Sequence, residues 1–139
     1  MRGGTVNVAA CVGLAAALKR VESGERLYSL KNEFIELVTK KIAGATVNGD
    51  IARSVPAIVN ISFKGISGAN LAAVLDTKGI CVSTGSACSA GAPVASYVVT
   101  AVAGKTRADG AVRFSFGKYT TRDDILKTVA ALEEIFNSP

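Results

Sequence analysis

The stretch AVRFSFG, residues 111–117, carries the clearest secondary-structure signal in the chain. Val112, Phe114 and Phe116 alternate with Arg113 and Ser115, which is the two-residue period of a strand with one buried face. The apolar side chains predict the core face, and Arg113 and Ser115 then point to the opposite face. An arginine there is either a solvated sheet residue or a guanidinium held on rigid backbone to bind a carboxylate, and the alternation alone fits both.

Strand and helix patterns alternate on either side of this stretch. IVNISF, residues 58–63, has the same two-residue period, and shorter strands are expected just after residue 44 and at 80–83. Amphipathic or capped helices are expected from about residue 5 to 18, from 25 to 43, after Ser67, from about Pro93 to Gly104, and after TTRDD at 120–124. This order predicts one α/β domain, a small sheet of three to four strands covered by helices.

Composition excludes several classes of function. The chain has 139 residues, of which 49% are hydrophobic and 19% charged, so it is long and apolar enough to form a core. It contains no histidine, which excludes a Ser-His-Asp triad, a Cys-His pair and a histidine-ligated metal, and no metal site is expected. The net charge of +5 is dispersed, with Lys31 among the residues assigned to solvent-facing helix surfaces, and this pattern predicts neither a nucleic-acid nor a membrane partner.

The three cysteines differ in their surroundings. An odd number without framework spacing predicts a reducing compartment, here the cytoplasm, and no secretory signal is expected at the start. Cys11 and Cys81 fit buried positions on a helix and a strand. Cys88 lies in ICVSTGSACSAGAP, residues 80–93, among small residues that predict a loop too slack to bury it. A reactive thiol and an incidental loop cysteine are both open on this evidence.

Four segments together resemble the C-terminal part of NifS/IscS-type cysteine desulfurases, in the class V aminotransferase family of pyridoxal-phosphate (PLP) enzymes. They are RGGTVNVAACVGLAAAL, VPAIVNISF, LDTKGICVSTGSACSAG and AVRFSFGKYTTRDDI, in that order. The resemblance implies the small C-terminal domain of a fold-type I PLP-dependent transferase, with a mostly antiparallel sheet (α+β). It also implies a division of the chain into residues 1–22, which join a large domain absent from this sequence, and the small domain 23–139.

The resemblance implies functional roles for three residues. Cys88 matches the loop cysteine that takes sulfur from L-cysteine as a persulfide and leaves L-alanine, so a long loop would serve sulfur transport. Arg113 matches the arginine that binds the substrate carboxylate. Thr5 matches a threonine at the cofactor phosphate of the opposite subunit, where a helix start suits an anion. The implied partners are a large PLP-binding domain, a second copy in a homodimer, and a sulfur acceptor or scaffold, as in iron–sulfur cluster assembly or thio-modification.

The sequence also departs from the family pattern. Lys118 stands where most relatives carry arginine, and APVASYVV replaces a Glu-Pro-Ser-His-like run. The lysine that carries PLP lies in the large domain, so the isolated chain is predicted to be inactive. Two alternatives stay open: a stand-alone acceptor of persulfide sulfur that uses Cys88 alone, and a related class V enzyme such as a selenocysteine lyase.

Overall fold

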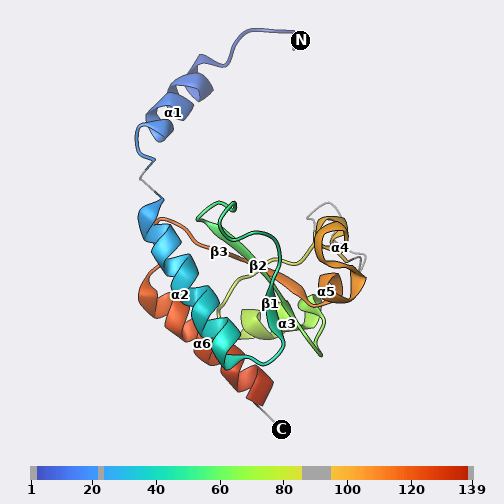
Figure 1. Ribbon diagram of the computed structural model, residues 1–139. Coiled ribbons are helices and arrows are strands. Elements are labelled where there is room, and N and C mark those ends of the chain that lie inside the picture. Colours follow the sequence, from blue (N-terminus) through green and yellow to red (C-terminus); the bar gives the residue numbers. More distant parts are fainter. Residues whose placement is uncertain (1–2, 22–23, 86–94, 138–139) are drawn as a thin grey trace.

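The computed structural model describes residues 3–21, 24–85 and 95–137 of the chain. Three strands form one antiparallel sheet in the order β1 (Ala45–Val47), β2 (Ile58–Phe63) and β3 (Ala111–Ser115), as Figure 1 shows. The expected small antiparallel sheet is therefore confirmed. Residues 80–83 are not a full strand, because a single bridge between Ser83 and Arg113 joins them to β3.

The core fills one face of this sheet, under helices α2 (Glu25–Lys41) and α6 (Arg122–Asn137) (Figure 1). The ring of Phe34 on α2 lies 4.9 Å from that of Phe114 and 5.7 Å from that of Phe116. Val112, Phe114 and Phe116 are all buried, as their alternation predicts. Each buried aromatic or aliphatic side chain of this kind contributes about 1.5–3 kcal/mol to folding.

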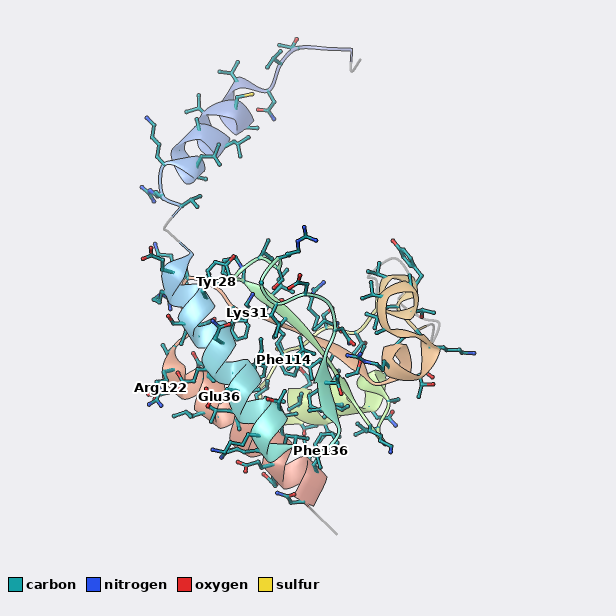
Figure 2. All side chains as sticks on the ribbon, viewed as in Figure 1. Tyr28, Lys31, Glu36, Phe114, Arg122 and Phe136 are labelled. Carbon is teal, nitrogen blue, oxygen red and sulfur yellow. The ribbon has the colours of Figure 1, made fainter. Side chains whose placement is uncertain are left out.

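Lys31 on α2 is fully buried, so its expected place on a solvated helix face is wrong. Its Nζ donates to Ser54 Oγ at 2.9 Å and to the Val55 carbonyl at 3.0 Å. The same atom lies 4.9 Å from the centre of the Tyr28 ring, and Figure 2 labels both side chains on α2. The long aliphatic stem of a lysine packs as an apolar group while its head reaches neutral acceptors. The side chain thereby ties α2 to the connection between β1 and β2.

Three shorter helices surround the sheet: α3 (Gly68–Thr77), α4 (Tyr97–Ala103) and α5 (Lys105–Asp109). Ser67 caps α3 as predicted, since its Oγ accepts from the Asn70 N–H at 3.2 Å. The expected start of α4 at Pro93 lies outside the described residues, and within them the helix begins after its cap, Ser96. The short helix α5 was not anticipated, because Gly104 was taken to end this helical region.

A reciprocal cap starts α6. The Asp124 carboxylate accepts from the Thr121 N–H at 2.9 Å and from its hydroxyl at 2.8 Å, and the Asp124 N–H donates to Thr121 Oγ1 at 3.3 Å. The backbone hydrogen bond from Thr121, followed by the one from its side chain, lowers the pKa of Asp124 below its ordinary value. This arrangement confirms the helix start predicted from TTRDD.

Helix α1 (Val8–Leu18) lies apart from the sheet and the other helices (Figure 1), and none of its residues is buried. Cys11 is therefore exposed, contrary to the expectation of a buried helix residue. Asn7 is the N-cap and accepts from the Ala10 N–H at 3.0 Å, so the helix begins at Val8, three residues after the position expected from the sequence. A helix that is apolar on all sides is ordinarily buried, so α1 exposes apolar surface that would suit a partner.

Candidate functional site

Four residues form a polar row across the sheet, on the face opposite the core. The Asn48 N–H donates to the Asn60 carbonyl at 2.8 Å, Asn60 is the cross-strand partner of Arg113, and Arg113 is the partner of Ser83. Directly opposed residues of neighbouring strands point their side chains to the same face. The row therefore brings side chains from four separate segments onto one surface, with Arg113 among them.

Arg113 is exposed, and its backbone is bound on one side only. Its N–H donates to the Ser83 carbonyl at 2.8 Å, and its carbonyl accepts from the Ser83 N–H at 3.2 Å. Asn60 and Arg113 are consequently a non-hydrogen-bonded pair, the arrangement in which opposed Cα atoms are closest, about 4.5 Å apart. The guanidinium makes no hydrogen bond or ion pair within the described residues, so no helix carboxylate there neutralises it.

A groove of about 460 Å³ lies along this row. Asn48, Asn60 and Arg113 line its polar side. Gly85, the last described residue before Cys88, also lines it. The apolar lining comes mainly from α4 and the first residue of β3, namely Val98, Val99, Val102 and Ala111. Val99 and Ala111 also pack with Ala108 of α5 in a small cluster that holds both helices to the sheet. The groove thus combines an unpaired cation with a fixed apolar wall.

A chain of side-chain hydrogen bonds joins this row to the buried Ser62 and to α5. The sequence alone did not predict it. Ser62 Oγ donates to the Arg107 carbonyl at 2.6 Å. Asn48 Nδ2 donates at 2.6 Å both to Ser62 Oγ and to Asn60 Oδ1. Ser62 is 4% exposed, so its hydroxyl is satisfied by protein groups alone. The polar residues on the outer side of IVNISF were the available signal, but their partners depend on strand register.

Two glycines allow the entry to the cysteine loop to pack closely. A Cβ at Gly68 would lie 2.5 Å from the Ala111 carbonyl oxygen and 3.3 Å from Thr84 Cγ2. A Cβ at Gly110 would lie against the Phe63 carbonyl oxygen, closer than real Cβ atoms approach. The start of α3, the start of β3 and Thr84 therefore meet without intervening side chains.

The other two residues singled out from the sequence are Thr5 and Cys88. Thr5 is exposed, precedes the cap of α1 and does not line the groove. Cys88 lies outside the described residues. Cys81 is exposed rather than buried in a strand, with its Sγ 3.9 Å from Asp76 Oδ1. Of the three candidate residues, Arg113 is therefore the one that the described part of the chain places in the groove.

The described residues do not form a complete PLP site. The groove lining contains neither a lysine that could form a Schiff base nor a carboxylate that could pair with a pyridine nitrogen. Within residues 3–21, 24–85 and 95–137, no group of three or more His, Cys, Asp or Glu could hold a metal. No helix in those ranges has the length and apolar character needed to cross a bilayer. The unpaired guanidinium of Arg113 can bind an anionic group such as a carboxylate or a phosphate.

Comparison with known proteins identifies relatives of one kind. The family model for aminotransferase class-V matches residues 1–127. The chain is 36% identical to the cysteine desulfurase IscS of Dictyoglomus turgidum, over 96% of this chain and 36% of that protein. It is also 36% identical to the cysteine desulfurase of a Nostoc species, over 96% of this chain and 35% of that protein.

Solved structures agree with the sequence matches. A NifS-like protein superposes with a TM-score of 0.78 and 28% sequence identity, covering 96% of this chain and 35% of the other. The chain therefore spans about a third of the length of the relatives it matches. The small three-stranded sheet with its helices is a fold found in NifS-like structures.

Proposed function

Because the chain belongs to the class-V aminotransferase family, which is PLP-dependent, we propose that it supplies the substrate-binding arginine and the thiol nucleophile of a cysteine desulfurase. Arg113 is the observation that supports this assignment most directly. Its guanidinium has no partner among the described residues and lines a groove with an apolar wall. A guanidinium fork on a rigid strand binds a carboxylate through two parallel hydrogen bonds.

The proposed reaction is written on Cys88. Its thiol accepts the sulfur of L-cysteine, so the carbon–sulfur bond of the substrate breaks and a sulfur–sulfur bond forms. The β-carbon gains a proton and leaves as the methyl group of L-alanine, while Cys88 carries the persulfide. No additional oxidant or reductant is needed, because the sulfur is oxidised as the β-carbon is reduced. Release of the persulfide sulfur to an acceptor thiol would restore Cys88.

The chain does not supply the whole catalytic site in this proposal. PLP acts as an electron sink when it is bound to a lysine, and the groove lining contains none. A large PLP-binding domain would bring that lysine, and the apolar surface of α1, with residues 1–22, is the proposed connection to it. A homodimer, in which Thr5 contacts the cofactor phosphate of the other subunit, belongs to the same proposal. The free thiols Cys11 and Cys81 fit the proposed cytoplasmic location.

The first experiment measures L-alanine after incubation of the chain with PLP and L-cysteine. We expect no turnover from the chain alone. A chimera in which the chain replaces the matching third of the Dictyoglomus turgidum relative should form L-alanine and a persulfide. Cys88→Ala should abolish both products, and Arg113→Ala should lower kcat/KM by at least a hundredfold, because a charged binding group is lost. Cys81→Ala is the matched cysteine control and should leave the rate unchanged.

The result that contradicts this proposal is an active chimera whose rate does not depend on Cys88 or Arg113. A stand-alone acceptor role gives a different outcome. In that case the unmodified chain, mixed with an active desulfurase and L-cysteine, would gain one sulfur atom on Cys88 by mass spectrometry. The same chain in the chimera would form no L-alanine.

A further inference from the structure

We infer that Asn60 donates a further hydrogen bond to the carboxylate bound by Arg113, and that Ser62 and Asn48 hold the Asn60 amide in the orientation that does so. This inference rests on the proposed function, which assigns a substrate carboxylate to Arg113. It adds a second binding residue and two positioning residues to that assignment.

The chain of hydrogen bonds begins at the backbone carbonyl of Arg107, which fixes the direction of every bond that follows. A carbonyl oxygen can only accept, so the single hydroxyl hydrogen of Ser62 must point to it across the 2.6 Å contact. Ser62 Oγ can then only accept from the Asn48 amide, which requires that Asn48 turn its NH2 group towards Ser62. The same NH2 group has a second hydrogen, and it lies 2.6 Å from the Asn60 side chain. Asn60 must therefore present its oxygen, Oδ1, to Asn48.

This orientation leaves the Asn60 NH2 group free. Its two hydrogens have no acceptor among the described residues, and Asn60 is half-buried in the lining of the groove. Arg113 is its direct cross-strand partner in a non-hydrogen-bonded pair, so the two side chains rise from the closest pair of positions in the sheet. The groove thus holds amide and guanidinium donors side by side.

A carboxylate matches such a group of donors. It has two oxygens with about four lone-pair directions, of which a guanidinium fork occupies two. An amide N–H beside the fork can occupy a third. Asn48 Oδ1 is a buried atom without a hydrogen-bond partner, at a cost of about 1–3 kcal/mol. The network therefore retains the donor orientation of Asn60 even though that orientation leaves another amide oxygen unsatisfied.

The test is an NMR titration of the full 139-residue chain with L-alanine, the proposed product, and with L-alaninamide, which lacks the carboxylate. The side-chain N–H signals of Asn60 and Arg113 should both shift with L-alanine and not with L-alaninamide. Asn60→Asp keeps an acceptor for Asn48 and removes the donors, so the chain should fold and bind L-alanine at least about tenfold more weakly. Asn32→Ala, an exposed asparagine on α2, should bind as the unmodified chain does.

Ser62→Ala tests the positioning role. It should change the Asn60 side-chain amide signals before any ligand is added and weaken L-alanine binding, while the backbone spectrum of the sheet is retained. Two results would overturn the inference and leave the proposed function standing. One is a response of the Arg113 signals without a response of the Asn60 signals, and the other is unchanged affinity of Asn60→Asp for L-alanine. No response at either residue would overturn the inference and also the carboxylate assignment of Arg113.

Discussion

Ser83, which precedes the cysteine loop, and Arg113 of β3 exchange two backbone hydrogen bonds, at 2.8 and 3.2 Å. The pair fixes the segment before Cys88 to Arg113, the residue proposed to bind the substrate. Cys88 follows Ser83 by five residues in the sequence. Changes at Ser83 should consequently affect Arg113 first.

Ser83→Pro should weaken this anchor. Proline has no N–H, so the bond to the Arg113 carbonyl is lost, and we expect a loss of about 1 kcal/mol in the free energy of unfolding. The amide of Arg113 should also exchange faster with solvent deuterium. Ser83→Ala keeps both backbone bonds and is the control, with an expected change of about 0.5 kcal/mol or less. Equal protection of Arg113 in the two variants would show that the pair is not an anchor.

Gly110→Ala should be strongly destabilising. The new Cβ would meet the Phe63 carbonyl oxygen at well under 3.0 Å, and backbone cannot rotate away as a side chain can. We expect a cost of about 1–3 kcal/mol in chemical unfolding. Gly13→Ala is the matched control, because no atom lies within 4 Å of its Cβ position and alanine favours a helix interior. Similar effects of the two substitutions would argue against close packing at the start of β3.

Asp124→Asn should remove a stability contribution that depends on pH. The pKa of Asp124 is lowered in the folded protein, so its ionised form is stabilised by folding. The contribution is complete above the unfolded value of 3.8 and is lost as the pH falls through the lower folded value. Thermal unfolding should show a lower Tm for the variant at pH 7. That difference should narrow at acid pH, whereas a constant difference across the range would contradict the assignment.

The isolated chain should self-associate through α1. Val8, Val12, Leu14 and Leu18 are each more than 60% exposed on a helix with no buried residue. Apolar surface of this kind is usually covered by a partner. Light scattering should report a mass above that of one chain, and Val12→Glu with Leu14→Glu should lower it. Leu126→Glu on α6 is the control, and a monodisperse monomer without substitution would contradict the prediction.

The sequence was informative where a single segment decides the structure. The alternation in residues 111–117 predicts both the buried side of β3 and the outward direction of Arg113, and Ser67 caps its helix as expected. It was misleading where the answer depends on distant contacts. The burial of Lys31 requires acceptors from Ser54 and Val55, which lie 23 and 24 residues further along the chain. A helical pattern read by itself assigns such a lysine to solvent.

The same distinction applies to the site. The alternation predicts the outward direction of Arg113 and the resemblance implies its role, whereas the period of residues 58–63 places Asn60 and Ser62 on the outer face of a strand and implies no role for them. Their proposed roles depend on strand register, because register pairs Asn60 with Arg113 and brings its side chain to Asn48. Cys81 was misplaced for a related reason, since residues 80–83 pair with β3 at one position and leave its thiol exposed.

The side chain of Lys31 is buried and fixes a neighbouring loop. It binds Ser54 and Val55, in the connection between β1 and β2 that starts with Asn48. That connection, which begins at the groove residue Asn48, is thus ordered when the chain folds. Ordering a loop during association commonly weakens affinity, and here that entropic penalty has been met in advance.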